Sequence, residues 1–189
     1  GRCAHQLPVA GGAIPAVVKS GELKGKPGQT LMLHSPAGVE AERVLLVGCG
    51  QNDELSDANY RKALQGAVSA LKGSAAKDAV FCLAELPVGE RGFDWKVRQA
   101  VEAIGNALYV YDETKSEKNE EDRPVLEEMT FLTAGEAETK AADKAIGEGG
   151  AISSGVALAM ELANLPGNIC TPSYLSEQAK ALGKQYKSL

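Results

Sequence analysis

The 189-residue sequence has few aromatic residues and few of the side chains that most often bind metal ions. Aromatics make up 5% of the chain, and only two histidines occur, His5 and His34. The four cysteines lie far apart without a CxxC pair, which excludes the usual zinc-finger spacing and a disulfide framework. We therefore expect small buried thiols at Cys3, Cys49, Cys82 and Cys170.

Membrane and nucleic-acid signals are also lacking. No stretch approaches the ~20 consecutive apolar residues of a membrane span, and the N-terminus has no basic segment followed by an apolar one. With 20 Lys and Arg against 25 Asp and Glu, the formal net charge is −5, which disfavours binding to a phosphate backbone. We therefore expect a cytoplasmic protein that does not bind a membrane, and nucleic-acid binding is disfavoured without being excluded.

What the sequence does contain is an alternation of short apolar runs with segments of helical periodicity, which is typical of an α/β domain. The apolar fraction of 44% is that of an ordinary globular protein. Four short apolar runs bounded by turn residues predict strands, and the first two are placed to pair as a hairpin. These predicted strands are residues 29–34, 43–47, 79–83 and 129–133.

Two helices are predicted between these strands. Apolar residues recur at helical spacing from Asp57, with Ser56 placed as the N-cap and Gly73 just beyond the last turn. After the third strand, a second apolar helical face runs from Val97 to Tyr111.

The stretch from Gly135 to Asn164 could form one long helix, but glycine is frequent in it. Each glycine costs a helix roughly 1 kcal/mol relative to alanine. Either the helix breaks near Gly149 or another backbone packs closely there, and we expect a long helix with a weak centre. Thr171 as N-cap and Pro172 in the first turn then predict a last helix. Its apolar face runs to the end of the chain, so we expect that more protein covers it.

The turn Gly48-Cys49-Gly50 is the first candidate for chemistry, because it follows a strand and precedes a helix as phosphate-binding glycine turns do. A third glycine would fall at Asp53, and the carboxylates of Asp53 and Glu54 would repel a diphosphate. A plain tight turn is therefore favoured over nucleotide binding. Cys49 has no His or Lys beside it to lower its pKa, which favours a structural thiol over a nucleophile.

The other candidates do not support catalysis either. His34 ends a strand without a serine, cysteine or aspartate at a spacing that would mark a triad. Between Asp112 and Glu128, eight acidic residues stand against three basic ones, which is typical of a solvated loop rather than a metal or docking site. The residues alone thus indicate an α/β domain without a self-contained active site, and we assign no catalytic, cofactor-binding or metal-binding residue.

The segment ANLPGNICTPSYL, residues 163–175, resembles the leucyl aminopeptidase (cytosol aminopeptidase) family where its catalytic domain begins. The fixed positions of the family pattern N-x-P-x-N-x-x-T-P are occupied by Asn164, Pro166, Asn168, Thr171 and Pro172. Upstream, SGELKGKPGQTLMLH, AERVLLVGCGQNDELS and ALYVYDETKSEK are similar to the family's N-terminal domain in order and approximate spacing.

The resemblance implies a macro-domain-like mixed sheet flanked by helices and followed by a long linking helix. It divides the chain into an N-terminal macro-like domain at 1–134, the linking helix at 135–164, and a truncated start of the catalytic metallopeptidase domain at 165–189. The family's first apolar strand has no counterpart in residues 1–13.

For the complete enzyme, the resemblance implies a cytoplasmic homohexamer that releases N-terminal amino acids, preferentially leucine, from peptides. Two divalent metal ions, Mn or Zn, would polarise the scissile carbonyl in the catalytic domain. The family's metal ligands and its motif NTDAEGR would follow Leu189, so no metal is expected in this portion, which would serve assembly and access. The alternative is a stand-alone macro-like module that binds a nucleotide or ADP-ribose.

Overall fold

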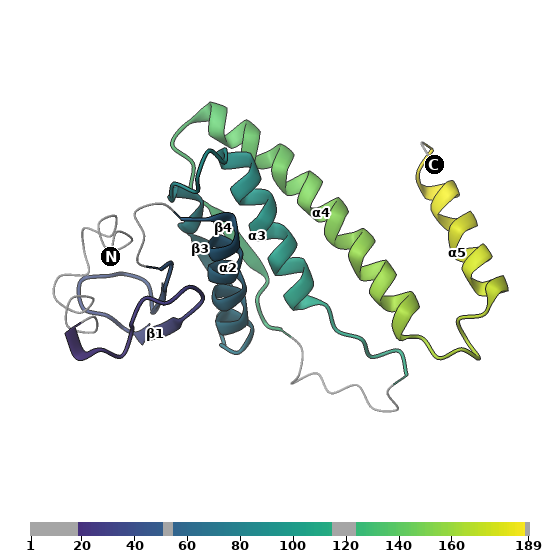
Figure 1. Cartoon of the computed structure of the whole chain (residues 1–189), viewed down its shortest axis with the longest axis horizontal. Helices are drawn as coiled ribbons and strands as arrows, with labels where there is room; N and C mark the ends of the chain where they lie inside the picture. The colour runs from purple at the N-terminus through teal and green to yellow at the C-terminus, as the bar shows by residue number, and fades with distance from the viewer. Residues whose placement is uncertain (1–18, 51–54, 115–123, 188–189) are drawn as a thin grey trace.

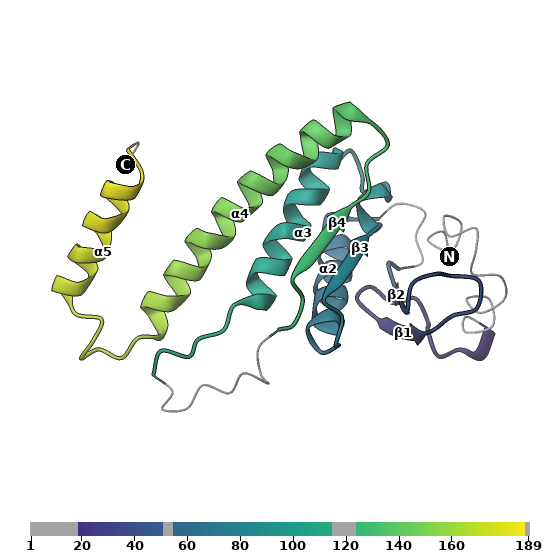
Figure 2. The same ribbon diagram turned by 180° about the vertical axis from the view of Figure 1, so that it is seen from behind.

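The computed structural model describes residues 19–50, 55–114 and 124–187 (Figure 1). Its helices α2, α3 and α4 lie side by side, and α5 stands apart near the C-terminus (Figures 1 and 2). In chain order the elements are β1 (Thr30–His34), β2 (Arg43–Val47), α2 (Asp57–Lys72), β3 (Asp78–Phe81), the 3₁₀ helix η2 (Leu83–Glu85), α3 (Phe93–Leu108), β4 (Glu128–Phe131), α4 (Glu136–Asn164) and α5 (Pro172–Gln185). This mixture of strands and helices confirms the predicted α/β class.

The described strands form two separate two-stranded sheets. β1 and β2 form the expected antiparallel hairpin, in which Thr30 lies opposite Val47 and His34 opposite Arg43. β3 and β4 are parallel and are connected through α3, as parallel strands require a crossover. The expectation of one mixed sheet is therefore not met in the described residues. The chain after β2 turns back onto the 25–29 turn, so β2 does not continue alongside β3.

The β3–β4 sheet is covered by helices on one face only. The side chains of Phe81 and Phe131 point into the core, with ring centroids 5.2 Å apart, whereas Val80 is 60% exposed. Figure 2 shows this pair of strands in front of α2 and α3. Because strand side chains alternate between faces, the described part leaves the second face open, contrary to the expected helices on both faces.

The core lies between α2, α3, η2, the β3–β4 sheet and the first half of α4. Helix α2 begins as predicted, since the Ser56 hydroxyl accepts from the amide of Asn59 at 3.3 Å, and it ends at Gly73. Its inner face buries Tyr60, whose hydroxyl donates to the carbonyl of Lys96 at 3.3 Å, and Leu64. The residues with under 2% exposure and the largest volumes are Tyr60, Leu64, Val88 and Val97.

Helix α3 ends earlier than the apolar pattern predicts. It stops at Leu108, and Tyr109 adopts an extended backbone with φ −62° and ψ 129°. Tyr109 and Tyr111 therefore do not belong to a helical face. They lie in an extended segment, and the Tyr109 side chain contacts α4.

Helix α4 is continuous over 29 residues despite its glycines. Gly149 is buried, and a Cβ atom built there would lie 2.9 Å from Cβ of Val101 and 3.2 Å from the carbonyl oxygen of Arg98. One turn further on, the same close approach brings Gly105 of α3 against Ser153. Of the two alternatives for the centre of this helix, close packing against another backbone is confirmed.

The last helix begins as predicted. The Thr171 hydroxyl accepts from the amide of Tyr174 at 3.3 Å, and Pro172 is the first helical residue. No residue of α5 is buried, and the side chains of Leu175 and Tyr186 are 45% and 47% exposed. The predicted apolar face of this helix is thus uncovered in the described structure.

Candidate functional site

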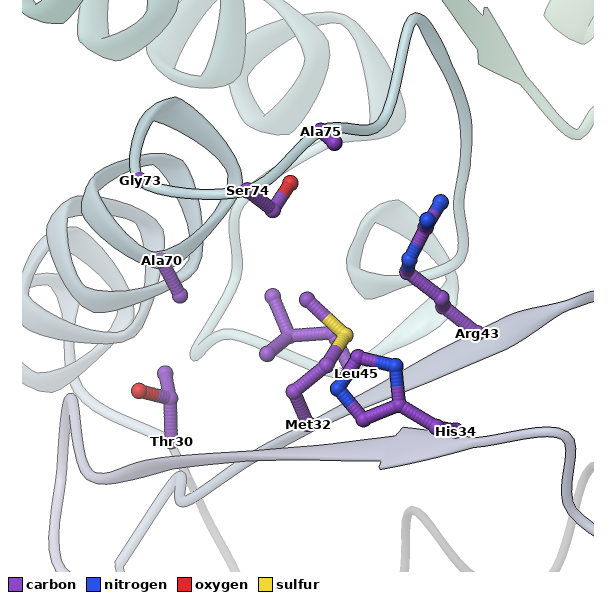
Figure 3. Close-up of a pocket in the computed structure, with 9 residues that line it drawn as sticks. All are labelled: Thr30, Met32, His34, Arg43, Leu45, Ala70, Gly73, Ser74 and Ala75. Carbon is purple, nitrogen blue, oxygen red and sulfur yellow. The ribbon is translucent and has the colours of Figure 1, made fainter.

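An open groove of about 410 Å³ lies between the β1–β2 hairpin and the C-terminal end of α2 (Figure 3). Thr30, Met32 and His34 alternate along β1 and so share one face of the hairpin. Because β1 and β2 are in register, Leu45 faces Met32 and Arg43 faces His34. The opposite wall consists of Ala70, Gly73, Ser74 and Ala75. This groove could not be predicted from a local sequence pattern, because its two walls come from separate segments of the chain.

The polar side chains of this groove are not arranged as a catalytic pair. The Ser74 hydroxyl donates to the carbonyl of Leu71 at 2.8 Å and accepts from the amide of Ala76 at 3.2 Å, so it caps α2. Arg43 forms an ion pair with Glu42 at 3.6 Å. The His34 imidazole makes no side-chain hydrogen bond to a described residue. The groove therefore lacks the paired base and nucleophile that hydrolysis would need.

The described part of the Gly48-Cys49-Gly50 turn is held by backbone contacts. The amide of Gly48 donates to the carbonyl of Gln29 at 2.7 Å, and the amide of Gly50 donates to the carbonyl of Gly25 at 2.8 Å. A Cβ atom at Gly48 would overlap the carbonyl oxygen of Lys26. These two amides are thus occupied, and the glycine at 48 is explained by close packing. Asp53 and Glu54 lie outside the described residues.

We therefore expect no binding of ADP-ribose or NAD⁺ by this turn. A phosphate group could accept from these two amides only after their hydrogen bonds to backbone carbonyls were broken. Calorimetric titration of the chain with millimolar ADP-ribose should give no binding heat, with ATP as a second probe. A saturating isotherm that disappears in Gly50→Ala would contradict this expectation and restore the nucleotide-module alternative.

The described cysteines are less buried than predicted. Cys49 and Cys170 are half-buried and Cys82 is exposed. Cys82 lies where β3 passes into η2 at the border of the core, which explains the difference. Desolvation of the sulfur and the carboxylate of Glu85 raise the pKa of the Cys82 thiol, so it is a poor nucleophile at neutral pH. Cys3 lies outside the described residues.

Metal-binding side chains are scattered in the described structure. No three His, Cys, Asp or Glu residues come together there in a group that could hold a metal ion. We therefore give no described residue a metal role. His5 and the middle of the acidic stretch, residues 115–123, lie outside the described part, so the solvated-loop prediction for that stretch stays a prediction.

The signature segment, residues 163–175 with the family pattern, joins α4 to α5 by a compact turn. The amides of Ile169 and Cys170 both donate to the carbonyl of Pro166 at 2.9 Å, and Thr171 then caps α5. Asn164 is the last residue of α4, and its side-chain amide donates to the Tyr109 hydroxyl at 3.3 Å. The family pattern includes Asn164 but carries no information about its partner Tyr109, which lies 55 residues earlier.

Within the described residues, none of the helices combines the length and the apolar character that crossing a bilayer requires.

Sequence comparison connects the chain to aminopeptidases. Residues 6–118 match the cytosol aminopeptidase family, N-terminal domain. A probable cytosol aminopeptidase of Pseudomonas aeruginosa (strain UCBPP-PA14) is 48% identical over 179 residues, which cover 95% of this chain and 36% of that protein. A cytosol aminopeptidase of Vibrio cholerae (strain ATCC 39315) is 43% identical over 181 residues, which cover 96% of this chain and 36% of that protein.

The fold is also similar to solved structures. The bottromycin maturation enzyme BotP in complex with Mn is 25% identical, with a TM-score of 0.71 over 93% of this chain and 34% of that one. A mutant of tomato leucine aminopeptidase is 26% identical, with a TM-score of 0.69 over 93% of this chain and 33% of that one. The chain thus spans about a third of the length of the relatives it matches. The match over residues 6–118 and this identity along nearly the whole chain place the protein in the cytosol aminopeptidase family, as its N-terminal domain.

Proposed function

We propose that this chain is the N-terminal, non-catalytic portion of a metal-dependent leucyl aminopeptidase. The observation that carries the proposal is the 48% identity to a probable cytosol aminopeptidase over 95% of this chain but only 36% of the relative. Among the described residues, no three His, Cys, Asp or Glu side chains form a group that could hold a metal ion. The peptidase chemistry would therefore belong to the region that corresponds to the rest of the relative.

In this proposal, residues 1–134 form the macro-like domain, 135–164 the linking helix and 165–189 the start of the catalytic domain. The continuous helix α4 and the capped start of α5 support these boundaries. The complete enzyme would act on peptides in the cytoplasm as a homohexamer, and two Mn or Zn ions would supply its Lewis-acid chemistry. This portion would contribute assembly of the hexamer and access to its active sites.

The first test is hydrolysis of a chromogenic leucyl substrate by the 189-residue chain with Mn²⁺ or Zn²⁺ supplied. We expect no turnover above the metal-only control, because the chain corresponds to only 36% of the relative and the catalytic region is proposed to lie in the rest. Turnover that a chelator abolishes would mean that metal ligands lie within this chain, and it would overturn the division of roles.

The second test is a chimera in which this chain replaces the matching third of the Pseudomonas aeruginosa relative. We expect the chimera to form the same oligomer as the parent protein and to hydrolyse the leucyl substrate. The matched control is the remaining part of that relative alone, which should fail to assemble. If the remaining part assembles and acts as well without this chain, the assembly role is wrong.

A further inference from the structure

The C-terminal half of α4 extends past the end of α3. Close packing between the two helices reaches Gly149, which meets Val101, and Ser153, which meets Gly105. The buried residues of α4 are Ala142, Ala145 and Gly149, all in its first half. Figure 1 shows the rest of α4 running beyond α3, beside the extended segment that follows α3. The last turns of α4 therefore lie beyond the close glycine contacts with α3, and contacts with the segment after α3 can add to what holds them in place.

A chain of side-chain hydrogen bonds provides such a contact. The Tyr109 hydroxyl donates to Oε2 of Glu161 at 3.0 Å and accepts from Nδ2 of Asn164 at 3.3 Å. Glu161 and Asn164 are three residues apart and so lie on the same face of the helix. Partial burial raises the pKa of Tyr109, so the phenol keeps its proton for Glu161 at neutral pH.

The geometry makes this contact directional. The Tyr109 oxygen uses its single proton toward Glu161 and a lone pair toward Asn164, so each partner favours the other. The acceptor is a carboxylate, and hydrogen bonds to charged groups are stronger than neutral ones. The helix also ends there: the amide of Leu165 makes the last helical hydrogen bond, to the carbonyl of Glu161 at 3.1 Å, and Leu165 itself has an extended backbone with ψ 136°.

We propose that Tyr109, Glu161 and Asn164 form a latch that fixes the last turn of α4 against the segment after α3. The latch sets the direction in which the chain leaves α4 toward the signature turn and α5. The three are positioning residues rather than catalytic ones. On the proposed function, on which only this consequence rests, the latch orients the entry into the catalytic domain.

Tyr111 supplies an internal comparison. Its hydroxyl is buried two residues further along the same segment and has no hydrogen-bond partner among the described residues. Loss of this hydroxyl removes no hydrogen bond, whereas loss of the Tyr109 hydroxyl removes two. The two tyrosine-to-phenylalanine substitutions are therefore matched in chemistry and differ in the latch.

The test is amide hydrogen exchange of the 189-residue chain, read at residues 161–165. We expect Tyr109→Phe to speed exchange there at least about tenfold, because it removes two hydrogen bonds, one of them to a charged acceptor, with little change in α2. Tyr111→Phe should leave exchange at 161–165 unchanged. Equal effects of the two substitutions, or no effect of Tyr109→Phe, would overturn the latch.

Further variants separate a latch from general packing. Glu161→Gln keeps an acceptor oxygen and should retain most of the protection, whereas Glu161→Ala and Asn164→Ala should lose it. The ¹³Cζ resonance of Tyr109 should shift in Glu161→Gln while that of Tyr111 does not. Failure of these results leaves the chimera experiment unaffected, so the latch and the proposed function can fail separately.

Discussion

Replacement of Leu64 by alanine is expected to lower the free energy of unfolding by about 3 kcal/mol, within the range for buried leucines. Leu64 is 1% exposed and lies on the inner face of α2, in the core shared with Tyr60, Val88 and Val97. Alanine is an excellent helix former, so α2 itself is not weakened and the loss reports on packing. Urea unfolding followed by circular dichroism measures the effect.

The matched control is Leu175→Ala in α5, the same substitution in another helix. Leu175 is 45% exposed and α5 buries no residue, so its replacement should change stability by less than about 0.5 kcal/mol. Equal losses at both positions would show that α5 is packed against the core in solution. No loss at Leu64 would contradict the placement of α2.

The neighbouring glycines Gly149 and Gly150 are expected to respond to alanine with opposite signs. At Gly150 nothing lies within 4 Å of a Cβ atom, so alanine should stabilise the protein by about 1 kcal/mol through helix propensity. At Gly149 a Cβ atom would lie 2.9 Å from Cβ of Val101, an atom that no rotamer change can move aside. Overpacking of this kind typically costs about 1 to 3 kcal/mol, which outweighs the gain and leaves a net loss of about 1 kcal/mol.

Thermal or urea unfolding of the two single variants measures this difference of about 2 kcal/mol between adjacent positions. The double variant Gly149→Ala with Val101→Ala provides a rescue control, because it removes the atoms that the new methyl group meets. Stabilisation by alanine at both glycines would mean that α3 and α4 are further apart than the structure places them.

Local signals in the sequence were sufficient where neighbouring residues decide the structure. The hydroxyl of Ser56 and that of Thr171 each cap a helix, because an N-cap needs only an amide three residues away. The hairpin of β1 and β2 followed from two apolar runs and the turn between them. The family followed from the spacing of residues within 163–175, which the match over residues 6–118 confirms independently.

Contacts between distant residues could not be predicted in this way. The period-3.6 pattern continued to Tyr111, yet the chain leaves the helix at Leu108, and the Tyr109 hydroxyl donates to Glu161. The pattern also gave no sign that β2 and β3 would remain in separate sheets. In both cases the competing partner lies far away in the sequence, so periodicity carries no information about it.

The sequence by itself determined the α/β class, the helix starts and the family membership, because these depend on periodicity within each segment, on caps next to each helix and on a nine-residue pattern. Only the tertiary structure decided whether the helix breaks at Gly149 or packs closely there, since a glycine in the sequence is equally consistent with a helix break and with close packing. It also decided the partners of Tyr109 and the groove between the hairpin and α2. These features depend on where distant segments meet, which packing of the whole core determines.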